Sequence, residues 1–219
     1  MKGERLSALV SFEALKLATA IVLLSPNIPL LFMGEEYGEE APFHYFISHS
    51  DQGLIEAVRK GRKAEFSAFQ WEGELPDPQD EATFLRSKIH LGLRQHGDHR
   101  ILLEYYKALI TLRKEIPALS HLSKVGMEIK TLTEKLTLFM DRRYEEDRVC
   151  GLFNFCEEPQ KINMAIEQGV WQKAFDSSAT EWGGPGRSAS EFIQSNGRES
   201  CIPMSAFSFV LYRGKRAKE

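Results

Sequence analysis

The spacing of apolar residues divides the chain into a helical part and a strand-rich part. Up to about Ile116, apolar positions recur every three or four residues, which is the period of helices buried on one side. After Leu122 the period shortens to two, which is typical of half-buried strands. We therefore predict a domain boundary between residues 122 and 123, with α/β structure over 1–122 and an antiparallel β-sandwich over 123–219.

Helical patterns account for most of the first part. The first of them is apolar around most of its circumference and therefore needs cover on several sides. Prolines, glycines and capping residues separate the helices from one another. The predicted helices are Arg5–Leu24, Asp51–Phe66, Asp80–Leu93 and His99–Ile116.

A short apolar run without alternation, Ile28–Met33, follows the first helix. Pro29 lies near its start, where a strand tolerates a missing backbone donor. An unbroken apolar run predicts a parallel strand that is buried on both faces. A helix, a tight turn and such a strand form half of an α/β repeat.

The second part contains short segments of alternating apolar and polar residues. Polar or glycine-bearing turns separate the segments, as in antiparallel sheets. The predicted strands are Met127–Leu132, Leu136–Met140, Val149–Phe155, Lys161–Ile166, Val170–Phe175 and Phe207–Tyr212.

Composition narrows the class of protein. Of the 219 residues, 42% are hydrophobic and 27% are charged, so disordered and transmembrane classes are excluded. The net charge of −3 gives no reason to expect a nucleic-acid partner, and we read the basic residues of the tail (Arg213, Lys215, Arg216 and Lys218) as a solvated terminus. Cys150, Cys156 and Cys201 form no C-x-x-C pair, which favours reduced thiols in the cytoplasm over disulfides or zinc. We expect no membrane association and no cofactor.

Candidate chemistry follows the predicted strand directly. Glu35 and Glu36 lie between Gly34 and Gly38, which allow the backbone to turn sharply and a ligand to approach closely. Carboxylates accept hydrogen bonds from hydroxyl groups, and aromatic faces cover the C–H side of a sugar ring. The predicted carbohydrate-binding residues are Glu35, Glu36, Tyr37, Phe43, Tyr45, Phe46 and His49.

Each of these residue types also has an ordinary structural use. Adjacent acids can cap a helix or accept backbone amides, and loop aromatics can form a small core. His44 and His49 lack a third ligand at helical spacing, so we read them as surface histidines and expect no metal site. Trp71 is either a packing residue or part of a cleft in the long loop.

Three stretches resemble a known family. LLSPNIPLLFMGEEYGEEAPFHYF at 23–46, LIEAVRKGRKAEF at 54–66 and PDPQDEATFLRSK at 76–88 resemble the C-terminal part of maltooligosyltrehalose trehalohydrolases. These are glycoside hydrolases of the α-amylase superfamily. The resemblance covers Gly3 to Pro117 well, whereas the strand-rich part matches in kind alone.

The resemblance implies both a fold and a reaction. Members cleave the α-1,4 bond next to a terminal trehalose unit and release trehalose. They use an aspartate nucleophile, a glutamate acid/base and a second aspartate in a retaining mechanism. The family places its last catalytic aspartate in an N-H-D motif, which the 219 residues do not contain. A complete (β/α)8 barrel needs about 250 residues. We therefore expect the C-terminal portion of a (β/α)8 TIM barrel followed by a β-sandwich, with no catalytic residue and no activity alone.

Partners and alternatives follow from this expectation. The substrate is expected to be of the maltooligosaccharide type. A homo-oligomer or an N-terminal half-barrel partner is expected to cover the exposed apolar surface. One alternative is a non-catalytic carbohydrate-binding or assembly module, such as one subunit of a split enzyme. Another is a fragment of a glucan branching or debranching enzyme.

Overall fold

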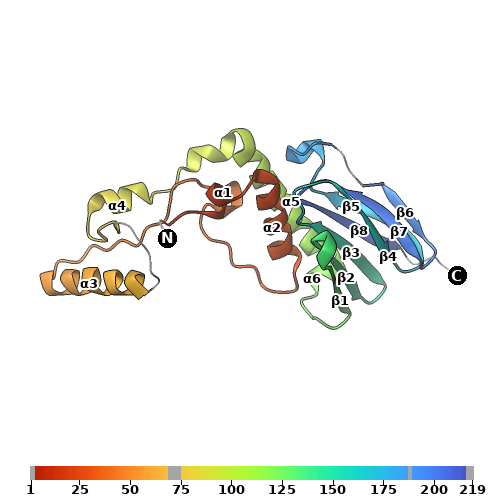
Figure 1. Cartoon of the computed structure of the whole chain (residues 1–219), viewed down its shortest axis with the longest axis horizontal. Coiled ribbons are helices and arrows are strands. Elements are labelled where there is room, and N and C mark those ends of the chain that lie inside the picture. Colours follow the sequence, from red (N-terminus) through yellow and green to blue (C-terminus); the bar gives the residue numbers. More distant parts are fainter. Residues whose placement is uncertain (1–2, 69–74, 187–188, 216–219) are drawn as a thin grey trace.

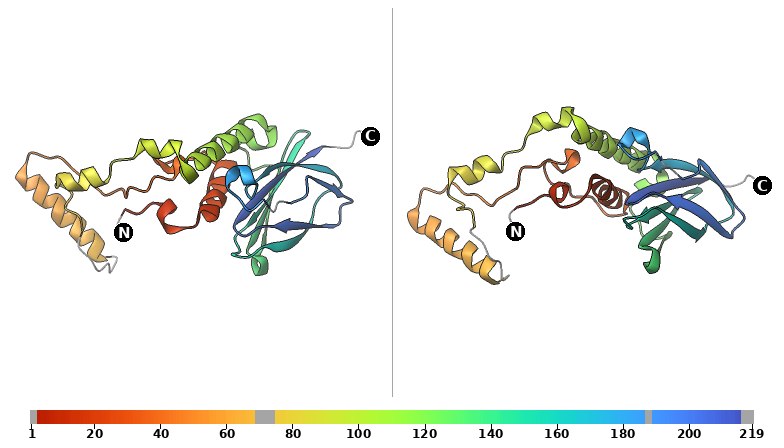
Figure 2. Two further views of the ribbon diagram at one scale, coloured as in Figure 1. Left: turned by 90° about the horizontal axis from the view of Figure 1, so that it is seen from above. Right: turned by 45° about the horizontal axis from the view of Figure 1, so that its top comes forward.

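A computed structural model describes residues 3–68, 75–186 and 189–215 as an elongated molecule. Helices α3 (Gln52–Ala68) and α4 (Glu81–Arg86) lie at one end and the β-sheets at the other (Figure 1). Figure 2 shows from two further directions that α3 stands apart from the sheets. Trp71 and the last two basic residues of the tail lie outside the described residues.

The first predicted helix is interrupted. Helix α1 covers Leu6–Leu9 and helix α2 covers Phe12–Leu24. Between them Ser11 has extended backbone, and its hydroxyl accepts a hydrogen bond from the Ala14 amide at 3.3 Å. Because serine competes for backbone amides in this way, it starts a new helix here. The prediction of one continuous helix was wrong.

The remaining predicted helices are present with altered limits. The prediction over Asp80–Leu93 becomes α4 and a separate 3-10 helix. The Asp80 carboxylate caps α4 by accepting from the Ala82 amide at 2.9 Å. The elements after α4 are η2 (Leu91–Gln95), α5 (Gly97–Glu115) and α6 (Pro117–Ser120).

The predicted buried strand is the main difference between sequence and structure. None of the described sheets includes the segment 28–33. Ile28 is 81% exposed and Leu30 is 93% exposed, whereas Leu31 packs against the core formed with α2 and α5. A parallel strand exists only when neighbours bind its amides and carbonyls. The described residues provide no such neighbour, so the predicted strand is wrong for this chain.

Two arginines fix the start of this segment at the end of α2. Arg113 donates to the carbonyls of Leu23 and Ser25 and, at 2.7 Å, to Asn27. Arg142, from strand β2 (Thr137–Tyr144), donates to the Leu24 carbonyl at 2.8 Å. The last carbonyls of a helix have no partner within it, and these guanidinium groups supply the missing donors.

The second part is a β-sandwich, as predicted. A six-stranded sheet has the order β1-β2-β3-β8-β5-β6, and a second sheet pairs β4 with β7. All six predicted strands are present, and β6 and β7 were missed. The strands are β1 (Met127–Leu132), β2 (Thr137–Tyr144), β3 (Asp147–Asn154), β4 (Gln160–Ala165), β5 (Gly169–Asp176), β6 (Phe192–Ser195), β7 (Glu199–Met204) and β8 (Ser208–Lys215).

The six-stranded sheet buries apolar residues on both faces. Val149 and Phe153 of β3 pack with α2, α5 and α6. Cys150 and Leu152, which point the other way, pack against the β4–β7 sheet. One face of the six-stranded sheet therefore shares a core with the helices, and the other face forms a separate core with the second sheet. The boundary at residue 122 stays a prediction.

Candidate functional site

The glycine-flanked turn after the exposed segment is a single turn of 3-10 helix. The helix η1 covers Glu35–Tyr37, between Gly34 (φ 85°) and Gly38 (φ 69°), which are both left-handed. A Cβ at Gly34 would lie 2.7 Å from the Glu39 Cβ, so the turn requires glycine there. Because the backbone is helical rather than extended, Glu35 and Glu36 do not alternate between opposite sides as they would in a strand.

Glu35 already has a structural partner. Its Oε2 accepts a hydrogen bond from the Phe32 amide at 2.9 Å. This is the ordinary use of an acid beside a turn. Glu36 is half-buried, as is Glu35. The carboxylate of Glu35 therefore ties the turn to the end of the segment 28–33.

Tyr37 is buried beneath the turn. Its hydroxyl donates to Glu39 Oε2 at 2.8 Å, and none of its surface is exposed. Burial, together with the hydrogen bond and the charge of Glu39, raises the pKa of Tyr37 to about 12. The phenol is therefore neutral at ordinary pH and acts here as a donor.

Glu39 is a fully buried carboxylate that the sequence analysis did not single out. Its oxygens accept from the backbone amides of Glu40, Ala41 and His90 and from the Tyr37 hydroxyl. Burial opposes ionisation of Glu39, but these hydrogen bonds outweigh it and hold the pKa at about 2. No local pattern identifies this residue, because His90 lies 51 residues away in the sequence.

Arg5 holds the two ends of the same loop together, and it too was missed. Its Nη1 donates to the Met33 carbonyl at 2.6 Å and its Nε to the Ala41 carbonyl at 2.8 Å. Its guanidinium lies 5.1 Å from the centre of the Phe32 ring. Arg5 is 8% exposed, and its Nη2 has no hydrogen-bond partner among the described residues.

Three phenylalanines on either side of the turn, together with one from α4, pack against one another. Ring centres lie 4.9 Å apart for Phe32 and Phe43, 5.9 Å for Phe43 and Phe46, and 5.1 Å for Phe46 and Phe84. All three pairs meet edge to face, which is a packing arrangement rather than a row of parallel platforms. These rings connect the loop to α4.

Tyr45 is the exposed aromatic of the predicted set. It is 48% exposed, and the Arg62 guanidinium of α3 lies 4.8 Å from its ring centre. Such a cation covers one face of a ring, so a ligand has the other face and the hydroxyl available.

The backbone amides of both histidines are hydrogen-bonded to side chains of residues that flank α4. The His49 amide donates to Gln79 Oε1 at 3.2 Å, and the His44 amide donates to Ser87 Oγ at 3.1 Å. Burial and the nearby Arg86 lower the pKa of His44. Within the described residues, no group of His, Cys, Asp or Glu side chains is arranged to hold a metal ion.

Two neighbouring hollows bring part of the predicted set together. The first has a volume of about 320 Å³ and is lined by Arg5, Phe32, Glu35 and Phe43, among others. The second, of about 280 Å³, is lined by Phe43, Tyr45 and Arg62 with residues around them. Phe43 borders both hollows, so this residue lies between them.

Comparison with known proteins shows which family the sequence resembles. No family model matches the chain. The malto-oligosyltrehalose trehalohydrolase of Rhizobium sp. (strain M-11) is 39% identical over 162 residues, which are 74% of this chain and 26% of that protein. By sequence, the chain resembles part of the malto-oligosyltrehalose trehalohydrolases. The resemblance seen in the three sequence stretches is thereby confirmed, and the chain spans about a quarter of the relative's length.

Solved structures show the same superfamily fold. A proposed alpha amylase from Salmonella typhimurium covers 98% of this chain with a TM-score of 0.74 and 28% identity, and 32% of that chain is matched. AmyP in complex with maltose covers 94% of this chain and is matched over 36% of its own, with a TM-score of 0.58 and 16% identity. The glycoside hydrolase fold of the α-amylase superfamily is thus confirmed, and helices followed by a sandwich are consistent with the C-terminal part of such a protein. Among the described helices, none combines the length and the apolar character needed to cross a bilayer.

Proposed function

We propose that the chain forms one side of the substrate cleft of a glycoside hydrolase that releases trehalose from maltooligosyltrehalose. The observation that carries the proposal is the pair of hollows at the glycine-flanked turn, in a chain whose sequence relative is a trehalohydrolase. The turn follows an apolar segment directly, and active sites of barrel enzymes lie after the carboxyl ends of their strands.

The residues around the hollows suit an uncharged sugar. Glu35 can accept hydrogen bonds from hydroxyl groups, and Arg62 can donate them. Phe43 and Tyr45 offer ring surface to the C–H groups of glucose units. Glu36, Tyr37, Phe46 and His49 are proposed to complete this surface or to support it. AmyP binds maltose, an α-linked glucose disaccharide, which fits the proposed substrate class.

The catalytic carboxylates are proposed to lie outside this chain. A retaining glycosidase holds two carboxyl groups about 5–5.5 Å apart across the bond that it cleaves. At this turn Glu39 is fully buried and accepts a hydrogen bond from the Tyr37 hydroxyl, and Glu35 accepts one from a backbone amide. These acids are therefore suited to building and lining the site rather than to covalent catalysis.

The exposed apolar segment is the proposed contact with the rest of the barrel. Ile28 and Leu30 point into solvent, and Phe32 and Met33 are 45% and 51% exposed. Adjacent exposed apolar residues offer side chains that a neighbouring element can cover. We propose that a half-barrel partner pairs with this segment.

The three cysteines suit a reducing compartment. Cys150 is buried, Cys156 is half-buried and Cys201 is exposed, and all three are free thiols. Free thiols persist where disulfides are kept reduced. We propose the cytoplasm as the location of the chain.

Reconstitution tests the proposed function. The chain is mixed with a polypeptide that comprises the part of the Rhizobium trehalohydrolase that it does not match, and maltooligosyltrehalose is added. We expect trehalose release from the mixture and none above background from either polypeptide alone. Trehalose release by the chain alone would contradict the placement of the catalytic acids. Branched glucan as the product would support a branching enzyme instead.

A further inference from the structure

The centre of the glycine-flanked loop depends on a single buried carboxylate. We propose that Glu39 is a positioning residue, which fixes the 34–41 loop against the segment before α5 and so sets where Glu35 and Glu36 face the saccharide. The consequence for the saccharide rests on the proposed function. The anchoring of the loop stands on contacts in the described residues alone.

The first set of contacts closes the loop on itself. Glu39 Oε1 accepts from the amides of Glu40 at 3.0 Å and Ala41 at 2.9 Å. Its own amide donates to the Gly34 carbonyl at 2.9 Å, and its Oε2 accepts from the Tyr37 hydroxyl at 2.8 Å. The 3-10 turn that carries Glu35 and Glu36 is enclosed between these bonds.

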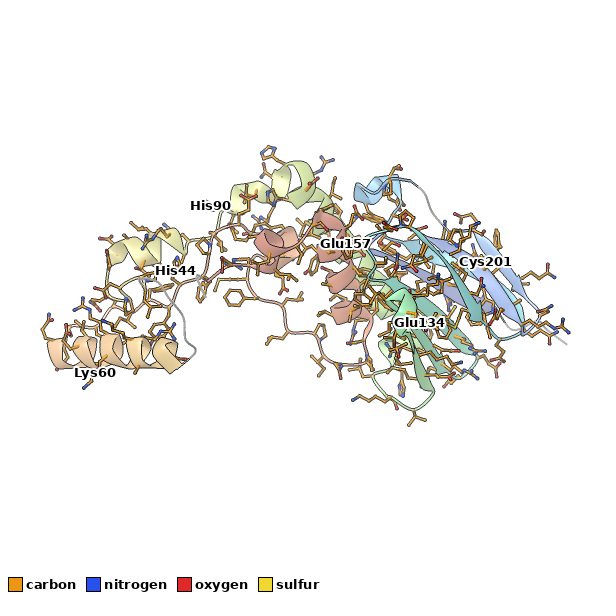
Figure 3. The ribbon with its side chains drawn as sticks, viewed as in Figure 1. His44, Lys60, His90, Glu134, Glu157 and Cys201 are labelled. Carbon is orange, nitrogen blue, oxygen red and sulfur yellow. The ribbon has the colours of Figure 1, made fainter. Side chains whose placement is uncertain are left out.

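The second set ties the loop to a distant part of the chain. The His90 amide donates to Glu39 Oε2 at 2.6 Å, and His90 Nδ1 lies 3.0 Å from Oε1. Figure 3 labels His90 on the segment between α4 and α5, above the loop. Because α5 packs against α2, this contact fixes the loop relative to the core.

Both oxygens of Glu39 face backbone amide hydrogens. Oε1 faces the amides of Glu40 and Ala41, and Oε2 faces the amide of His90. A glutamine has the same shape, but its NH2 group is a donor and would meet a backbone donor at either position. Substitution by glutamine therefore leaves one buried amide without an acceptor, although the volume is unchanged.

Arg5 and Ser7 cannot replace this anchor. Arg5 donates to the carbonyls of Met33 and Ala41 at the two ends of the loop, and Ser7 Oγ donates to the Glu39 carbonyl at 2.7 Å. All three bonds satisfy acceptors of the loop. The amides of Glu40 and Ala41, at the C-terminal end of the loop, depend on the Glu39 carboxylate.

The first test measures the loop without any substrate. Glu39→Gln is compared with Glu40→Gln, which changes the neighbouring carboxylate that is 72% exposed. Hydrogen exchange by NMR should show the amides of residues 38, 40 and 41 opening about tenfold faster or more in Glu39→Gln, with α5 amides unchanged. The pKa of Tyr37 should fall from about 12, because a negative charge beside the phenol is removed. Glu40→Gln should leave both readouts as in the wild type.

Unchanged exchange and an unchanged Tyr37 pKa in Glu39→Gln would overturn the proposal. If Glu39→Gln does not fold, titration of the wild-type carboxyl by carbon-13 NMR decides instead. A Glu39 pKa of about 2 supports the anchor, and a pKa at the ordinary value of 4.5 overturns it.

The second test measures the consequence for the saccharide in the reconstituted enzyme. We expect Glu39→Gln to raise KM about tenfold and to change kcat less, because the loop contacts substrate and supplies no catalytic acid. A wild-type KM in a variant whose loop opens would overturn the link to the saccharide and leave the proposed function intact. Failure of the wild-type mixture to release trehalose would count against the proposed function, while the exchange result still decides the anchor.

Discussion

Buried charges organise the site loop and the end of the helix before it. Glu39 accepts hydrogen bonds from amides of the loop and of His90, and Arg5 donates hydrogen bonds to carbonyls at the two ends of the loop. Arg142 and Arg113 donate hydrogen bonds to the carbonyls at the end of α2. Each charge replaces lost hydration with several hydrogen bonds to the backbone. Removing one is therefore expected to cost more than removing a charge at the surface.

The acid stability of the chain should depend on Glu39. Its pKa is about 2 when folded and near 4.5 when unfolded, so its contribution is complete above about pH 4.5 and is lost as the pH falls towards 2. The difference corresponds to a contribution on the order of 3 kcal/mol at neutral pH. Urea unfolding between pH 7 and pH 3 should show a loss of stability in the wild type that is smaller in Glu39→Gln. Equal losses in both proteins would contradict this assignment.

Arg142 offers a prediction with a close control. Its side chain is 2% exposed and donates to the carbonyls of Leu24 and His121. Arg142→Met should lower the free energy of unfolding by about 2–3 kcal/mol, because the buried Leu24 carbonyl and the partly buried His121 carbonyl lose a charged donor. Arg143, next to it, has a side chain that is 49% exposed, and Arg143→Met should cost less than about 1 kcal/mol. Equal costs in urea titrations would refute the cap.

The sequence predicts those features that depend on residues close together in the chain. The turn at Gly34 and Gly38 could be predicted, because closely spaced glycines after an apolar run favour left-handed backbone. The Asp80 cap could be predicted from its position before a helical pattern. Glu39 and Arg5 could not, since their partners come from parts of the chain that only folding brings together.

At the level of elements, α2 is joined to the sandwich by a buried lysine. Lys16 is fully buried, and its Nζ donates to the carbonyls of Ser177 and Trp182 at 2.9 and 2.8 Å. Glu13 lies 2.9 Å from the same Nζ. Burial lowers the pKa of Lys16, and Glu13 opposes that shift. The lysine therefore fixes α2 to the loop after β5.

Lys16→Met should weaken this junction strongly. The two carbonyls lose their donor and the half-buried Glu13 loses its counter-ion, so we expect a loss of about 2–4 kcal/mol in the free energy of unfolding. The fluorescence of Trp182 should report the change during urea unfolding. Lys107→Met, which removes an exposed pair with Glu104, should cost less than about 0.5 kcal/mol. Similar costs for both variants would contradict the role of Lys16.

The strands could be predicted more completely than the helices. Alternation identified strands in which one residue in two packs into a core, as in β4, where Ile162 and Met164 are buried. It missed β6, which has four residues, and β7, which contains Pro203. The break at Ser11 was missed because apolar residues continue on both sides of it. Ile28–Met33 has the composition of a strand and lacks a partner among the described residues, which sequence periodicity does not report.

For the whole molecule, the exposed segment 28–33 should govern association. Leu30 is 93% exposed and contributes little to the stability of the monomer. Leu30→Asp should leave the free energy of unfolding within about 0.5 kcal/mol of the wild type. It should also reduce self-association in sedimentation velocity and weaken binding to the complementary polypeptide. Normal binding by Leu30→Asp would show that this segment is not the contact.

Labelling of the catalytic nucleophile tests the central claim most directly. The claim is that this chain shapes the substrate cleft, whereas another part of the barrel carries the acids that cleave the sugar. A fluorinated glucosyl fluoride, which traps the covalent intermediate of retaining glycosidases, is added to the reconstituted mixture, and both polypeptides are analysed by mass spectrometry. We predict a glucosyl adduct on the complementary polypeptide and none on this chain. An adduct on any residue of this chain would contradict the account.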